Sequence, residues 1–143
     1  LYLSTQFNEN GYGGISKFFL EQSEEEREHM IKLMNYLLDQ DATPAIPNYN
    51  YMEEMEETFN ILTHFENCLH NERKVTQSVN NIVNKCKEVN DIQTENFMQW
   101  FVTEQLEEEV KFKSIIDDLK IIGDNGSGLF ELNRMLGTLP TEE

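Results

Sequence analysis

Apolar residues recur at steps of three and four along most of the chain, which is the spacing of an amphipathic helix. Glycine and proline, seven and three in number, fall mainly between the periodic segments. The pattern predicts an all-α protein, and its 143 residues are enough for one domain with a sizeable core. The predicted helices cover about residues 1–9, 14–39, 52–88, 93–122 and 127–137.

The longest connection in this pattern covers residues 41–50. Ten to twelve extended residues span roughly 35–40 Å, which is about the length of the preceding helix. The connection can therefore run the full height of a bundle, so we expect a four-helix bundle with one long crossover loop and a short fifth helix at the C-terminal end. Because the chain begins inside a helical pattern with no start signal, we also expect the first helix to be truncated.

Polar residues interrupt the core-facing stripes of the second, third and fourth predicted helices. Each interruption lies near the middle of its helix, so these side chains should meet at one level when the helices pack side by side. The second stripe is expected to continue into the core through Leu33 and Leu37. The interrupting residues are Glu26 and His29 on the second helix, Glu72 on the third, and Gln105 and Glu108 on the fourth.

A cation is the natural partner for such a set, because burying several carboxylates without a counter-charge would cost several kcal/mol per ion. Carboxylates with one imidazole and one amide suit iron, manganese or zinc better than calcium. The three-residue spacing of Glu26 and His29 directs both donors to one ion from one helical face.

Di-iron bundles use a glutamate from each of two helices and a Glu-x-x-His motif from each of the other two. Here the second motif is replaced by Gln105 and Glu108, with no histidine. We therefore expect the second metal to be held more weakly, which would suit a site that passes oxidised metal onward.

The charge of the chain favours cations as partners. Asp and Glu number 27 against 11 Lys and Arg, a formal net charge of -16, which repels the phosphates of nucleic acids. No stretch approaches the ~20 apolar residues of a membrane span, so neither nucleic acid nor membrane is an expected partner. Cys68 and Cys86 would lie roughly 27 Å apart on one helix, too far for a disulfide, which suits the reducing cytoplasm.

Three motifs on the same helices resemble the bacterial-type non-haem ferritins, and the resemblance extends over essentially the whole chain. Residues 25–33 read EEREHMIKL, residues 72–79 read ERKVTQSV, and residues 99–115 read QWFVTEQLEEEVKFKSI. The resemblance implies a ferritin-like four-helix bundle. It further implies iron storage with ferroxidase activity, in which Fe(II) and O2 or peroxide are substrates and ferric mineral collects in a shell of twenty-four identical subunits.

The resemblance also implies the roles of individual residues at a dinuclear iron site. Glu26 would bridge the two irons, with His29 on the first iron and Glu72 on the second. Gln105 would lie beside them as a polar partner.

A possible third iron site of the bacterial family falls on four further acids of this chain, and two aromatic residues match positions near the centre. Acids that flank a site can equally form a solvated helix face, and aromatic residues can serve packing alone. The third-site residues are Glu25, Glu104, Glu107 and Glu108, and the aromatic residues are Tyr2 and Trp100.

Two other functions remain open from the sequence. One is a subunit that builds the shell and nucleates mineral without catalysing oxidation. The family's first helix supplies another glutamate one heptad before the position of Tyr2, where this sequence does not reach, and its loss would favour such a subunit. The other is a stand-alone di-iron oxidase or an acidic interaction bundle. The lack of Cys-x-x-Cys pairs argues against a rubrerythrin-like electron-transfer protein, and the fifth helix argues against a small DNA-protecting cage.

Overall fold

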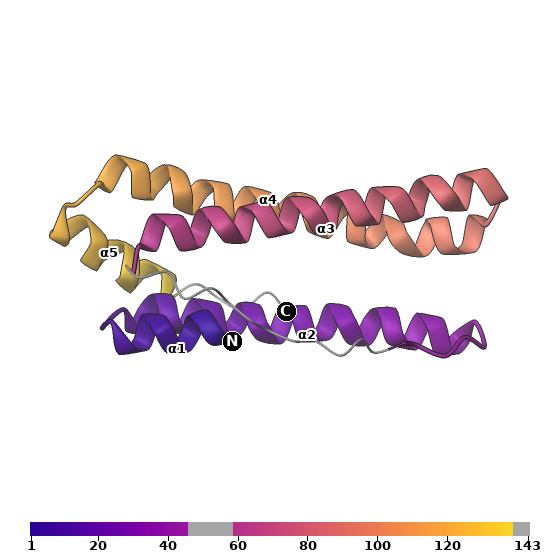
Figure 1. Ribbon diagram of the computed structural model, residues 1–143, viewed down its shortest axis with the longest axis horizontal. Coiled ribbons are helices and arrows are strands. Elements are labelled where there is room, and N and C mark those ends of the chain that lie inside the picture. The colour runs from indigo at the N-terminus through magenta and orange to yellow at the C-terminus, as the bar shows by residue number, and fades with distance from the viewer. Residues whose placement is uncertain (46–58, 139–143) are drawn as a thin grey trace. The chain divides into compact units, whose positions relative to one another are not determined.

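The computed structural model describes residues 1–45 and 59–138, and the regular elements of this part of the chain are all helices (Figure 1). This confirms the all-α class. The chain divides into two compact units, of which one contains α1, α2 and α5 and the other α3 and α4. Residues 46–50 of the predicted crossover loop lie outside the described residues. The helices are α1 (Tyr2–Glu9), α2 (Gly13–Asp39), α3 (Ile61–Val89), α4 (Ile92–Ile122) and α5 (Gly126–Leu136).

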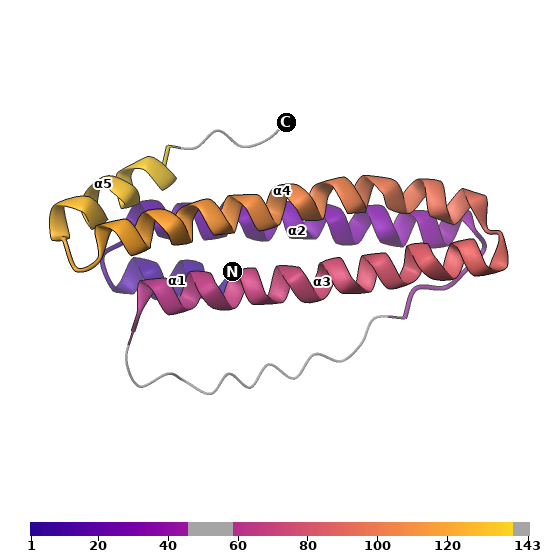
Figure 2. The same ribbon diagram turned by 90° about the horizontal axis from the view of Figure 1, so that it is seen from above.

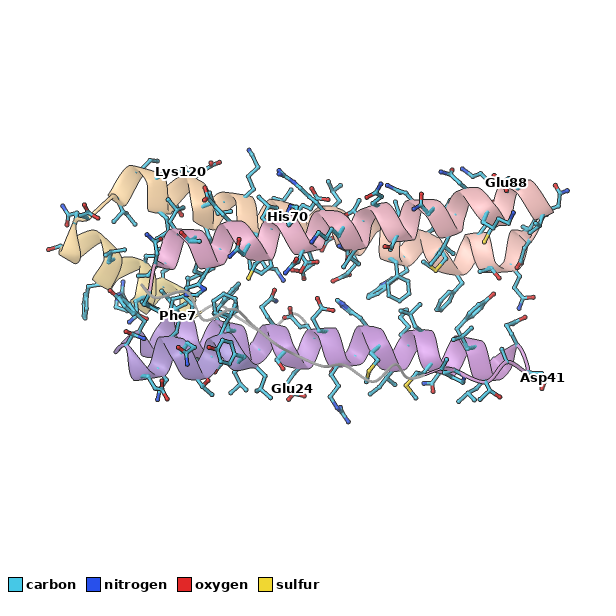
Figure 3. All side chains as sticks on the ribbon, in the orientation of Figure 1. Phe7, Glu24, Asp41, His70, Glu88 and Lys120 are labelled. Atoms are coloured by element: carbon cyan, nitrogen blue, oxygen red, sulfur yellow. The ribbon has the colours of Figure 1, made fainter. Side chains whose placement is uncertain are left out.

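In the first unit, α1 and α2 form a helical hairpin around Phe7. Gly11 lies in the turn between them with φ of 84°, a left-handed conformation that glycine adopts without strain. Phe7, which is labelled in Figure 3, is fully buried, and its ring stacks on that of Phe19 at a centroid distance of 5.2 Å. Burying a phenylalanine side chain stabilises a fold by about 1.5–3 kcal/mol, so this pair is a main contact of the hairpin.

The two helices of this hairpin differ greatly in length. α1 has 8 residues and α2 has 27, which at about 1.5 Å per residue makes them roughly 12 Å and 40 Å long. The buried side chains of α2 all lie near its start, at Ile15, Phe18 and Phe19. Leu33 and Leu37 are 37% and 40% exposed, so within the unit of α1, α2 and α5 they do not lie in the core that was predicted for them.

The start of α2 is capped by a side chain from α5. Oδ1 of Asn133 accepts hydrogen bonds from the backbone N–H groups of Gly14 at 2.9 Å and Ile15 at 3.0 Å. Nζ of Lys17 donates to the carbonyl of Gly137 at 3.0 Å. A Cβ atom on Gly14 would lie 1.7 Å from the backbone oxygen of Asn133. The close approach of α5 to α2 therefore requires glycine at position 14.

In the second unit, α3 and α4 run antiparallel along their whole length (Figures 1 and 2). The chain reverses at Asn90, whose φ of 57° ends α3. Asp91 then caps α4 by accepting a hydrogen bond from the backbone N–H of Thr94 at 3.0 Å. The Thr94 hydroxyl also donates to the Asp91 carboxylate at 2.6 Å, and these hydrogen bonds lower the pKa of Asp91.

The apolar stripes predicted for α3 and α4 face the interior. Rings of Phe65 and Phe112 approach to 6.2 Å, and Val79, Val83, Met98 and Phe101 form one cluster. Cys86 is buried and Cys68 partly buried, and neither forms a disulfide within the described residues. Within the described ranges, no helix is both long and apolar enough to cross a membrane. Buried stripe residues are Phe65, Leu69, Val79, Val83 and Cys86 on α3, and Phe101, Gln105, Glu108, Phe112, Ile115 and Leu119 on α4.

The first turn of α3 lies later in the chain than its periodicity predicts. Asn60 has extended backbone angles, and its side chain accepts a hydrogen bond from the backbone N–H of Thr63 at 3.0 Å. Asn60 is therefore the N-cap and the helix begins at Ile61. The predicted start at about residue 52 is wrong for residues 59 and 60, and residues 52–58 lie outside the described residues.

We expect Gly14→Ala to lower the free energy of unfolding by about 1–3 kcal/mol, because the new methyl group would force α5 away from α2. Gly13→Ala is the matched control, since a Cβ there meets no atom within 4 Å. Urea unfolding of both variants measures the difference. Equal stability of the two variants would show that the approach of α5 to α2 is not tight.

Candidate metal centre

On α2, the Glu-x-x-His motif brings its two donors together. Nδ1 of His29 lies 3.6 Å from Oε2 of Glu26. The His29 side chain is 16% exposed and that of Glu26 is 59% exposed. Within its own unit Glu26 is therefore exposed, contrary to the prediction that it lies in a buried core stripe. The motif nevertheless presents an imidazole and a carboxylate from one face of the helix.

Glu25 precedes this motif and has a partner on the same helix. Its carboxylate accepts a hydrogen bond from Nε2 of Gln22, one turn earlier. The amide of Gln22 thus directs this carboxylate along α2. Tyr2, on α1 of the same unit, is 38% exposed.

In the second unit, a glutamine on α4 holds a glutamate on α3. Nε2 of Gln105 donates to the carboxylate Oε2 of Glu72 at 3.2 Å and to its backbone carbonyl at 3.2 Å. Gln105 is only 5% exposed, so its amide needs such partners. The two residues were predicted to share a site, and the structure brings them into direct contact.

Glu108 lies one turn after Gln105 and is 3% exposed. Its position within the apolar stripe of α4 is as predicted. Nζ of Lys111 donates to Oε1 of Glu108 at 2.9 Å. A cation therefore already accompanies this buried carboxylate, and the sequence analysis missed that lysine because it stands beside a long acidic run.

Glu109 is a second residue that the sequence analysis did not assign to the site. The hydroxyl of Thr76 donates to Oε1 of Glu109 at 2.6 Å, and Nε of Arg73 lies 3.5 Å from Oε2. Thr76 and Arg73 are on α3, so Glu109 ties the two helices together next to Glu72. The signal that could have found it is the stripe position of Thr76, one turn after Glu72.

The remaining predicted residues on α4 are less buried. Glu104 is half-buried and Glu107 is exposed. Trp100 is 37% exposed and packs edge-on against Phe101, with a centroid distance of 4.8 Å. Packing of the indole on a core ring accounts for the position of Trp100.

The predicted donors are divided between the two units. Within the described residues, no group of three or more His, Cys, Asp or Glu side chains is close enough together to hold a metal ion. Each unit by itself supplies part of the set: an imidazole and carboxylates from α2, and carboxylates with an amide from α3 and α4. Oxygen donors with one imidazole suit iron or another first-row transition metal.

A family model described as the ferritin-like domain matches residues 1–122. The chain is 36% identical over 132 residues to the bacterial non-heme ferritin of Escherichia coli O6:H1, and the matched region covers 92% of this chain and 78% of that protein. It is 34% identical over 149 residues to a probable bacterial non-heme ferritin-like protein of Haemophilus influenzae, and the matched region covers 99% of this chain and 85% of that protein.

Similar solved structures are ferritins as well. A humanized archaeal ferritin has a TM-score of 0.94 at 26% identity, with 100% of this chain and 86% of that chain covered. An open pore ferritin from Archaeoglobus fulgidus has a TM-score of 0.90 at 28% identity, with 98% of this chain and 85% of that chain covered.

We expect Gln105→Met to lower the free energy of unfolding by about 1–3 kcal/mol, because it removes both hydrogen bonds to Glu72 while conserving volume. Gln99→Met is the control, since Gln99 is exposed on the same helix and should change stability by less than about 0.5 kcal/mol. Urea unfolding measures both. In a Glu72→Ala background the cost of Gln105→Met should shrink; an undiminished cost would mean that Gln105 does not act through the Glu72 carboxylate.

Proposed function

The chain belongs to the ferritin-like domain family and has its four-helix bundle fold with a short fifth helix, and on this basis we propose that it is an iron-storage ferritin with ferroxidase activity. It would oxidise Fe(II) to Fe(III) at a dinuclear site and deposit ferric mineral inside a shell. The observation that carries the proposal is the pair of buried polar residues, Gln105 and Glu108, in an otherwise apolar stripe.

The proposed first iron is held by Glu26 and His29, and the second by Glu26 and Glu72. The proximity of the Glu26 and His29 side chains supports the first assignment. The hydrogen bond from Gln105 to Glu72 supports the second, because it fixes the orientation of a carboxylate without neutralising it. Gln105 itself is a weak ligand, so the second iron would leave more easily once oxidised.

In the proposed reaction, two Fe(II) ions each give up one electron. O2 accepts both electrons with two protons and leaves as hydrogen peroxide; with peroxide as the oxidant, two electrons and two protons yield water. The carboxylates favour this step because their negative charge stabilises Fe(III) more than Fe(II).

A third iron would bind at the surrounding acids, which we propose as an outer site. Glu25 and Glu108 each already have a partner that orients the carboxylate, Gln22 and Lys111 respectively. Glu104 and Glu107 are the more accessible members and could take up iron from solvent.

We further propose that identical subunits, twenty-four in the complete shell, enclose the mineral. The net charge of -16 supports a cation store, because an acidic protein attracts Fe(II) by long-range electrostatics. On α5, Phe130 is 68% and Met135 40% exposed, and apolar side chains on this scale suit contact with neighbouring subunits. The reducing cytoplasm is the proposed location, and neither nucleic acid nor a membrane is a proposed partner.

We expect Glu26→Ala and His29→Ala each to slow the initial oxidation of Fe(II) by more than about tenfold, because each removes a direct iron ligand. Glu24→Ala is the control: it is an exposed glutamate on the same helix and lies outside the proposed site (Figure 3). Stopped-flow absorbance at the ferric band follows the reaction. If the Glu26→Ala and His29→Ala variants oxidise Fe(II) as fast as the wild type, the proposed ferroxidase activity is excluded.

The alternative function is a shell subunit that nucleates mineral without oxidising iron. Light scattering combined with the kinetics separates the two. A particle of several hundred kilodaltons that lacks the fast oxidation phase would support the alternative, and a monomer or dimer would exclude both.

A further inference from the structure

Lys111 and Glu108 form an ion pair unlike the exposed pairs of the same helices. Nζ of Lys111 lies 2.9 Å from Oε1 of Glu108, and the two side chains are 21% and 4% exposed. By contrast, Lys113 pairs with Asp117 at 3.6 Å with side chains 66% and 59% exposed. An exposed pair of that kind contributes little because water screens it, whereas a nearly buried carboxylate depends on its counter-ion.

This ion pair also involves a residue of the proposed outer iron site. Glu108 is one of the proposed outer-site ligands, so a cation of the protein itself already occupies one of its two oxygens. An ammonium and an Fe(II) ion cannot share one carboxylate closely without repulsion, since both are positive. Lysine has a flexible four-carbon stem, and the partial exposure of Lys111 leaves the stem a path to solvent.

We propose that Lys111 is a built-in competitor for iron at Glu108. Its ammonium holds the carboxylate when no iron is present, and iron enters the outer site only when that ammonium swings away. The outer site therefore binds Fe(II) more weakly than Glu108 alone would allow, and Lys111 returns when iron leaves for the mineral. This inference rests on the proposed function, because iron is the incoming cation.

The competing explanation is that Lys111 only stabilises the fold. Both explanations predict that Lys111→Met lowers the stability of the metal-free protein, because Glu108 would be left buried without a counter-ion. Only competition predicts that the same variant binds iron more tightly. Metal affinity is therefore the measurement that separates them.

The experiment is an anaerobic calorimetric titration of the full chain with Fe(II). Lys111→Met should raise the affinity of the weaker class of sites by at least about tenfold. Lys111→Arg keeps the positive charge and should bind as the wild type does, and Lys113→Met controls for the loss of one lysine from the same helix. Should Lys111→Met fail to fold, Lys111→Gln carries the same test, because its amide can still donate to Glu108 without a charge.

Unchanged affinity in a folded Lys111 variant, with normal binding of two Fe(II) ions elsewhere, would overturn this inference and leave the proposed function standing. Absence of Fe(II) binding by the wild type and every variant would overturn the proposed function and the inference together. A tighter outer site in Lys111→Met that Lys111→Arg does not reproduce is the result that the competition predicts.

Discussion

The polar residues buried along α4 require partners, and this requirement determines how the neighbouring residues of the site are arranged. Glu108 is 3% exposed on a helix face whose other members include Phe101 and Phe112, so water cannot supply the solvation that its charge needs. Lys111 supplies the counter-ion of Glu108. The buried amide of Gln105 finds its partner in Glu72, to which it donates a hydrogen bond. No buried side-chain nitrogen or oxygen among the described residues lacks a partner. A polar layer of this kind is stable because each member is satisfied.

The periodicity of the sequence correctly predicted the buried faces of α3 and α4, because each of these helices covers the other along its length. Phe101 and Phe112 fix the phase of the α4 stripe, and that phase places Gln105 and Glu108 inside. The same reasoning failed for the later part of α2. A periodic pattern shows which face of a helix is apolar but not which part of that face a neighbouring helix covers. Within its unit α2 buries only side chains near its start, and Leu33, Leu37 and Glu26 are exposed.

Within the candidate site, contacts inside one helix could be predicted and contacts between helices could not. A spacing of three residues places Glu26 beside His29 in any α-helix. The hydrogen bond from Thr76 to Glu109 depends instead on the register of α3 against α4, which hydrophobic periodicity leaves undetermined. Lys111 went unnoticed for a related reason: its importance comes from the burial of its partner, and burial is a property of the folded chain.

The account as a whole depends on iron binding where α2, α3 and α4 carry their polar residues. Anomalous diffraction at the iron absorption edge, from crystals of the chain loaded with Fe(II), tests this most directly. The account predicts two neighbouring iron atoms, ligated by Glu26, His29 and Glu72, with Gln105 beside them. Iron bound only at exposed acids away from these residues, or none at all, would contradict it.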